Sequence, residues 1–214
     1  MHPLRRFERF LLEQRAGLVR ARLEKQLPST HSYSFTADWF SNRISVWQKH
    51  LAVLAGQPNL HALEIGSFEG RSALWLLEHI LTDPSSTLTC VDPFLGIGGS
   101  LRFDHNIRLS GQATRVQKLQ GSSHDVLPTL AREIFDLIYI DGSHKAADVY
   151  FDALLSWCLL KNGGILIFDD YLWQPPTDAR ASQSPKIAID LFLEGYVQQL
   201  ELLHRGQQVI VRKN

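Results

Sequence analysis

From residue 61 onward, short apolar runs alternate with amphipathic segments, and this alternation constrains the fold more than any other feature of the chain. Short apolar runs of this kind are typical of parallel strands buried on both faces, and the segments between them have the spacing of helices that cover a sheet. The pattern therefore predicts an α/β fold with a doubly wound sheet that is mostly parallel.

The predicted strands and helices follow from this alternation, with boundaries uncertain by about 2 to 4 residues. We expect strands at about 61–66, 86–91, 115–119, 134–140, 164–169, 198–204 and 207–212. We expect helices at about 70–82, 100–110, 123–132, 145–160 and 185–195. Only a tight turn near Arg205 and Gly206 joins the last two strands, so these two must be antiparallel. The predicted sheet is seven-stranded and ends in a C-terminal antiparallel hairpin strand.

The first part of the chain differs from the rest and predicts an N-terminal helical extension or lid, residues 1–58, before the main domain, residues 59–214. Residues 1–25 have the spacing of a basic amphipathic helix, with Leu4, Phe7, Leu11 and Leu18 on one face. A further helix is expected before residue 56, where Gly56 and Pro58 end it; its apolar positions are Trp39, Ile44, Trp47, Leu51 and Leu54. Docking on the domain or on a second subunit of a homodimer is one interpretation of this helix, and a membrane-surface or targeting role is another.

Composition excludes several classes of function. The chain has 214 residues, of which 44% are apolar and 21% charged, and its formal net charge is zero. These values are typical of one soluble globular core, and they argue against a nucleic-acid partner. No apolar run approaches the roughly 18 to 20 residues of a membrane span, and no secretory signal is recognisable, so we expect a cytoplasmic protein without a transmembrane segment.

A glycine-containing turn follows the first predicted strand in "ALEIGSFEGRSALWLLEHI". Gly66 and Gly70 allow the backbone to approach a ligand, and the helix that follows offers free N–H groups. The GxGxxG fingerprint of dinucleotide sites is absent. Glu64, before the first glycine, would repel a pyrophosphate but accept hydrogen bonds from an ammonium group or a hydroxyl. Ser67 and Ser72 are candidates for helix caps or for cofactor contacts.

The next two strands end in further polar groups. "TCVDPF" places Asp92, followed by Pro93, at a strand tip 22 residues beyond Gly70, where an acid can bind both hydroxyls of a ribose. "LQGSSHDVLPTL" follows the third strand, and its Gly121, Ser122 and Ser123 are placed to line an adenine edge. One glycine turn alone is weak support for a cofactor, whereas three elements in this order on consecutive strands are much stronger.

At this point the chain resembles a known family. "LEIGSFEGRSALWL", "VDPF", "GSSHDVLPTL", "FDLIYIDGSHKAADV" and "LLKNGGILIFDDY" resemble the successive motifs of class I S-adenosylmethionine-dependent methyltransferases, over residues 60–212. The resemblance implies a Rossmann-like sheet that binds S-adenosyl-L-methionine. The implied cofactor-binding residues are Glu64, Gly66, Ser67, Gly70, Ser72, Asp92, Pro93, Gly121, Ser122, Ser123 and Asp141.

An acidic group ends the fourth and fifth predicted strands, with Asp141 after one strand and Asp169 and Asp170 after the other. Neighbouring strands lie about 4.8 Å apart, so these carboxylates can reach one ion, and hard divalent cations such as Mg²⁺ prefer oxygen ligands. A helix cap and loop contacts are the alternative reading. DGSH with FDDY resembles the metal-dependent O-methyltransferases of the macrocin and mycinamicin type, and by that resemblance the three aspartates are metal ligands.

His144, three residues after Asp141, is the candidate catalytic base. An acceptor hydroxyl loses its proton as it attacks the methyl group, and imidazole, with a reference pKa of about 6.5, accepts protons near neutrality. Related catechol-type enzymes carry a lysine at this position, and here Lys145 follows one residue later. A His144 that merely begins the following helix is the alternative.

The predicted function is therefore Mg²⁺-assisted O-methylation of a hydroxyl on a small molecule such as a sugar or natural product, with Asp141 and His144 as catalytic residues. Two alternatives stay open: a metal-independent N- or C-methyltransferase, and a non-catalytic module of the same fold. Five aromatic side chains are candidates for the wall of the acceptor site, with core packing as the other possibility. They are Trp39, Phe40, Phe94, Tyr171 and Trp173.

Overall fold

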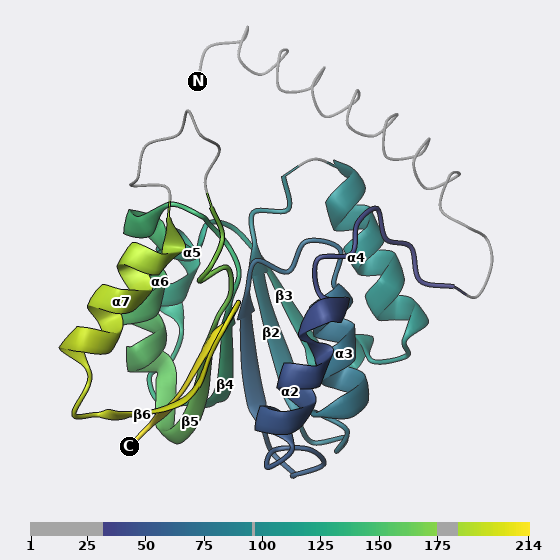
Figure 1. Cartoon of the computed structure of the whole chain (residues 1–214). Coiled ribbons are helices and arrows are strands. Elements are labelled where there is room, and N and C mark those ends of the chain that lie inside the picture. The colour runs from purple at the N-terminus through teal and green to yellow at the C-terminus, as the bar shows by residue number, and fades with distance from the viewer. Residues whose placement is uncertain (1–31, 96, 175–183) are drawn as a thin grey trace, which may run out of the picture.

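A computed structural model describes residues 32–95, 97–174 and 184–214. Its strands form one seven-stranded sheet in the order β3-β2-β1-β4-β5-β7-β6 (Figure 1). The strands are β1 His61–Ile65, β2 Thr87–Asp92, β3 Val116–Gln120, β4 Phe135–Ile140, β5 Leu160–Phe168, β6 Leu200–Arg205 and β7 Val209–Lys213. The helices are α2 Ile44–Leu51, α3 Arg71–His79, α4 Ile97–Leu109, α5 Ser123–Val126, α6 Ala146–Leu159 and α7 Pro185–Gly195, with short 3₁₀ turns at η1 Ser41–Arg43, η2 Ala113–Arg115 and η3 Leu127–Thr129.

Strand pairing confirms the predicted sheet. The first five strands in the chain pair with parallel neighbours, whereas β7 runs antiparallel to both β5 and β6. β1 and β4 lie side by side in the middle of the sheet, and the connections after them go to helices on opposite faces. This is the switch point at which doubly wound sheets bind ligands, outside the carboxyl ends of the strands. β4 and β5 are neighbours, as the placement of the acidic group required.

Helices cover both faces of the sheet (Figure 1). α2, α3 and α4 lie on one face, and α5, α6 and α7 lie on the other. Because strand side chains alternate between the faces, each face has its own apolar core: Tyr139 and Ile167 belong to the first, and Ile138 and Phe168 to the second. Within the described residues, no helix is long and apolar enough to cross a membrane.

Three elements differ from the sequence prediction. The helix expected at 123–132 is one α-turn, α5, followed by η3, because Pro128 lies at the start of η3 and cannot donate a backbone hydrogen bond. β5 begins at Leu160 rather than 164, through the paired glycines at 163 and 164. The helix expected through Trp39 starts only at Ile44, so Trp39 precedes it.

The segment before β1 packs on the domain where the structure describes it. Phe40, Trp47 and Leu51 are buried in the same apolar core as α3. The predicted basic helix of residues 1–25 lies outside the described residues, as does most of the proline-containing loop after β5.

Candidate active site

Close packing against the loop after β4 explains the glycine at position 66 in the turn after β1. Gly66 has φ +91°, and a Cβ added there would lie 2.1 Å from the carbonyl oxygen of Asp141. The turn therefore touches the loop after β4, which only glycine permits. Gly70 caps α3 in the left-handed conformation with φ +83°, and a Cβ there would lie 3.0 Å from the ring of Phe103.

Glu64 lies beneath this turn and is fully buried. The Ser72 hydroxyl donates to Glu64 Oε1 at 2.5 Å, and the Cys90 thiol lies 3.7 Å from Oε2. Burial raises the pKa of Glu64 to about 7, because a carboxylate loses hydration in the core. Ser72 thus serves to hold the Glu64 carboxyl, while the buried Ser67 hydroxyl has no hydrogen-bond partner among the described residues.

Asp92 ends β2 and joins two loops. Its carboxylate accepts hydrogen bonds from the backbone N–H of Phe68, at 2.9 Å, and of Phe94, at 2.5 Å. The aspartate therefore ties the glycine turn to the loop after β2. Its position at the strand tip is the one predicted for a ribose-binding acid.

A pocket of about 450 Å³ opens between these loops, within the range of small-molecule sites. Five predicted cofactor residues line it: Gly66, Asp92, Pro93, Ser122 and Ser123. We call this pocket the cofactor cleft. A second, smaller hollow shares Gly66 with it and is lined by Ser67, Ser72 and Asp141 among others. Glu64, Gly70 and Gly121 line neither, and Gly121 packs closely on α5, since a Cβ there would lie 2.8 Å from a methyl carbon of Val126.

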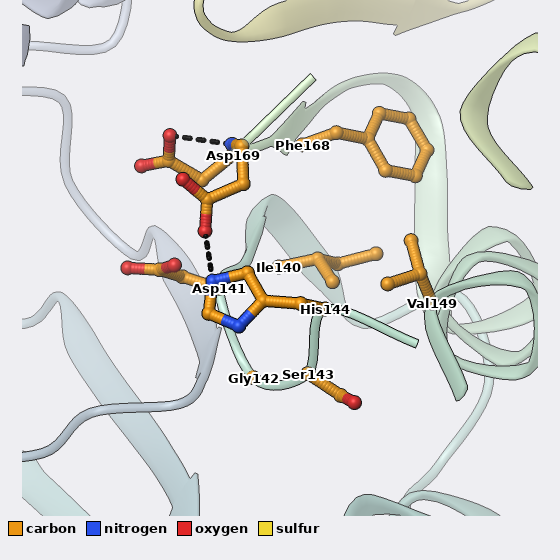
Figure 2. Close-up of a pocket in the computed structure, with 9 residues that line it drawn as sticks. Ile140, Asp141, Gly142, Ser143, His144, Val149, Phe168 and Asp169 are labelled. Atoms are coloured by element: carbon orange, nitrogen blue, oxygen red, sulfur yellow. Dashed lines mark hydrogen bonds and ion pairs between the residues drawn. The ribbon is translucent and has the colours of Figure 1, made fainter. Parts of the chain in front are cut away.

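The predicted acids come together at the tips of β4 and β5 (Figure 2). Asp169 is buried and fully engaged. Its Oδ1 accepts from the Asp170 backbone N–H at 2.7 Å and lies 3.2 Å from Arg43 Nη2, while its Oδ2 accepts from Tyr139 at 2.5 Å and from Gln208 at 2.9 Å. We call Asp141, Asp169 and Asp170 the acid cluster.

Asp141 and Asp170 are less engaged than Asp169. Asp141 Oδ2 accepts from the Tyr139 hydroxyl at 2.8 Å, and Asp170 Oδ2 lies 2.8 Å from His144 Nε2. Asp141 and His144 lie close together in Figure 2. The second oxygen of each carboxylate has no protein partner among the described residues. Burial, and then the neighbouring charges of Asp169 and Asp170, raise the pKa of Asp141. Asp170 itself has φ +57°, a strained conformation for a residue with a side chain.

His144 is brought to the acid cluster as predicted. Its hydrogen bond with Asp170 raises its pKa, and its ring stacks on Trp173 with centroids 4.3 Å apart. The other candidates for the wall of the acceptor site differ in their exposure. Phe40, Phe94 and Tyr171 are buried in the core, whereas Trp39 is 70% exposed and stacks on Phe68.

Three partners of the acid cluster were not identified from sequence. Tyr139 stands two residues before Asp141, so the period of a strand places both on one face, and that signal was available. Arg43 and Gln208 come from distant parts of the chain, and no local pattern marks them. Trp47 Nε1 in turn donates to Gln208 Oε1 at 2.8 Å, which connects α2 to the network.

The three predicted metal ligands differ in whether their carboxylate oxygens are already bonded to protein groups. Among the residues that the structure describes, no three His, Cys, Asp or Glu side chains are arranged to hold a metal ion. Arg43 takes the position of counterion at Asp169, whereas Asp141 and Asp170 keep free oxygen atoms. Two carboxylates with oxygen to spare fit Mg²⁺, which keeps several of its waters.

The chain is similar in sequence to curated O-methyltransferases and in fold to solved structures. The chain is 31% identical over 119 residues to the O-methyltransferase hkm8 of Aspergillus hancockii, covering 55% of this chain and 44% of that protein. It is 29% identical over 127 residues to a catechol O-methyltransferase of Mycobacterium tuberculosis, covering 58% and 54%. The chain therefore spans about half the length of the curated relatives it matches.

Solved structures share the fold at low identity. An O-methyltransferase from Bacillus cereus, in complex with SAH, matches with a TM-score of 0.62 and 19% identity over 94% of this chain and 90% of that one. TomG, an O-methyltransferase of tomaymycin synthesis from Streptomyces achromogenes in complex with SAM, matches with a TM-score of 0.63 and 19% identity over 93% and 89%.

A family model supplies the assignment. The model described as "Methyltransferase domain" matches residues 63–171, which run from β1 through the acid cluster and include the glycine turn, Asp92 and His144. This stretch is just over half of the 214 residues. The chain therefore belongs to this methyltransferase domain family.

Proposed function

We propose that the protein transfers a methyl group from S-adenosyl-L-methionine to a hydroxyl of a small molecule. The observation that carries the proposal is the pairing of His144 with Asp170 beside Asp141. Asp141 and His144 lie on the loop after β4, which also lines the cofactor cleft. Gly142 and Ser143 line both the cleft and the pocket of the acid cluster, so a methyl donor and a proton acceptor are neighbours. Family membership and the SAM- and SAH-bound proteins of the same fold support the choice of cofactor.

The cofactor, when bound, supplies a methyl group on a sulfonium sulfur that leaves as a neutral thioether. The protein's part is to position the reactants and to accept one proton. His144 Nε2 donates to Asp170, which fixes the tautomer and leaves Nδ1 as the free acceptor nitrogen. The proton of the acceptor hydroxyl passes to Nδ1 as the oxygen bonds to the methyl carbon. Trp173, stacked on the ring, limits its rotation.

Lys145 is the competing base, and the contacts of the two residues favour His144. The backbone N–H of Lys145 donates to the Ser143 hydroxyl at 3.2 Å, and Lys145 occupies the N-cap position of α6. His144 has a carboxylate partner that raises its pKa, and it lines the pocket of the acid cluster. These features suit a proton acceptor that works near neutral pH.

Magnesium assistance is the finer part of the proposal. Asp141 and Asp170 would hold the ion, because each has a carboxylate oxygen without a protein partner among the described residues. An ion there would lower the pKa of an acceptor hydroxyl that coordinates it. Asp169 would not hold the ion, because its oxygens already contact Arg43, Tyr139 and Gln208.

The test measures S-adenosylhomocysteine formation with a panel of hydroxylated sugars, natural products and matched amines. We expect turnover with hydroxyl acceptors, and a fall of about 100- to 10,000-fold in kcat for His144→Gln with cofactor affinity retained. His79→Gln, an exposed histidine at the far end of α3, is the matched control. Turnover with amines alone would favour the N-methyltransferase alternative.

Chelation separates the metal from the base. We expect EDTA to abolish turnover and Mg²⁺ to restore it, with Asp141→Asn insensitive to added metal. Full turnover in EDTA would remove magnesium from the proposal and leave His144 as its centre.

A further inference from the structure

Two histidines lie side by side where α2 meets the C-terminal hairpin of β6 and β7. The imidazole rings of His50, on α2, and His204, on β6, have centroids 5.3 Å apart, with 46° between their planes. Both side chains are partly buried. Unlike the rings of His61, His105 and His144, neither ring has a hydrogen-bond partner among the described residues. The proposed methyl transfer uses neither of them.

A β-bulge in β6 turns His204 toward α2. Leu202 of β6 pairs with Val211 of β7, and the next pair joins His204 to Ile210, so β6 has one residue more than β7 at this point. Paired residues project to the same face, and Ile210 belongs to the core that α2 covers. Without the bulge His204 would pair with Val209, which belongs to the opposite core. Bulges re-aim side chains at sheet edges and beside functional sites, and β6 is an edge strand.

Gly206 leaves space beside one nitrogen of this ring. A Cβ at this position would lie 2.8 Å from His204 Nε2, so any other residue would crowd that nitrogen. The φ of Gly206 is not in the left-handed region, so the backbone conformation does not require a glycine there. The glycine is therefore explained by the imidazole and not by the turn.

Both rings are neutral at neutral pH, which is the form in which imidazole binds metal ions. Burial lowers the pKa of His50, with contributions from His204 and Lys49, and burial followed by the Lys49 charge lowers the pKa of His204. The charge of Lys49 also disfavours ions that are held mainly by charge, such as Mg²⁺. It leaves the divalent ions for which imidazole nitrogen is a preferred ligand, which are Zn²⁺, Ni²⁺ and Cu²⁺.

The spacing of the rings fits one shared ion. An ion about 2.0 to 2.1 Å from a nitrogen of each ring, in tetrahedral geometry, would place the two centroids about 5 Å apart. Two protein ligands are fewer than structural zinc sites use, so water would complete the coordination and the ion would exchange.

The two histidines belong to the elements that support the acid cluster. Arg43 is the N-cap residue of α2, and Gln208 lies in the turn between β6 and β7; both contact Asp169. An ion shared by His50 and His204 would therefore connect these two elements directly.

We propose that His50 and His204 form a site for a divalent transition-metal ion that fastens α2 to the C-terminal hairpin. This site is distinct from the proposed magnesium site in its ligands and in the class of ion that it selects. It does not depend on the proposed methyl transfer.

The experiment titrates the full chain with Zn²⁺ by calorimetry and follows its thermal unfolding. At a free Zn²⁺ concentration of about 100 times Kd, we expect the unfolding midpoint to rise by about 5 to 10 °C. His50→Gln and His204→Gln should each bind one ion fewer and lose this rise, because one imidazole does not hold the ion. Two controls should keep the ion: His79→Gln, which removes an exposed histidine, and His144→Gln, which removes the histidine of the acid cluster.

Pulsed electron paramagnetic resonance of bound Cu²⁺ counts the coordinated imidazoles directly. We expect two in the unaltered protein and fewer in His50→Gln and in His204→Gln. A single imidazole in the unaltered protein, or no bound ion, would overturn the inference, and this result needs no variant that might fail to fold. Unchanged Zn²⁺ binding in both variants, or its loss in His144→Gln, would place the ion elsewhere and overturn the inference as well.

Discussion

The cofactor cleft and the acid cluster lie at the same edge of the sheet, but their polar groups are satisfied differently. In the cleft, most of the contacts involve the backbone: Gly66 lets two loops approach each other, and Asp92 accepts hydrogen bonds from two backbone N–H groups. A pocket of about 450 Å³ stays open between the loops. In the acid cluster, side chains bond to side chains, and Asp169 is surrounded by Arg43, Tyr139 and Gln208.

The difference indicates what each region requires to bind a ligand. The cleft has an open volume of about 450 Å³ between loops that backbone contacts hold together, which is the form of a pre-formed small-molecule site. Both oxygens of Asp169 already have protein partners, Arg43 among them. Asp141 and Asp170 each keep a carboxylate oxygen without a protein partner among the described residues, so the proposed ion would be held by these two.

The largest effect should come from the backbone frame of the cleft. Gly66→Ala places a methyl group against the Asp141 carbonyl oxygen and forces φ +91° on alanine. We expect a loss of more than about 4 kcal/mol of unfolding free energy, measured by urea denaturation, and no measurable cofactor binding.

Gly163→Ala is the control for Gly66→Ala, because Gly163 has φ +80° but no neighbour within 4 Å of an added Cβ. It should cost only about 1 to 2 kcal/mol, the strain of the left-handed conformation alone. Equal losses in the two variants would mean that the contact between the loops contributes nothing.

The next effect tests the acid cluster. Arg43→Met leaves the buried Asp169 without its cation, and we expect about 3 to 5 kcal/mol of destabilisation by urea denaturation at pH 8. Arg212→Met breaks an exposed ion pair with Glu201 and should cost at most about 1 kcal/mol. If both variants lose the same small amount, the Arg43–Asp169 pair is no more important than a surface pair.

The smallest effect concerns Glu64, a buried acid on the cleft side. Because burial raises its pKa to about 7 from 4.5, the folded state holds a proton that the unfolded state releases. Stability should therefore fall by up to about 3 kcal/mol as pH rises from about 4.5 to about 7. Glu64→Gln should lack this part of the pH dependence. An unchanged slope in urea denaturation between pH 4.5 and 8 would show that Glu64 is not the group responsible.

Local sequence patterns were sufficient for the elements and for the strand tips. The alternation of apolar runs predicted the seven strands, and the motif positions predicted where Asp92, Asp141 and His144 would stand. Two helix predictions were wrong in their bounds: Pro128, which cannot donate a backbone hydrogen bond, divided the helix at 123–132, and the helix before β1 began after Trp39 rather than at it.

The sequence by itself determined the order of the elements and the residue types at the sheet edge, because strand period and glycine turns are local properties of the chain. The tertiary structure alone decided how the charges there are satisfied. Arg43, before β1, and Gln208, between β6 and β7, both reach Asp169. Contacts between distant segments have no period in the sequence, and they appear only once the chain is folded.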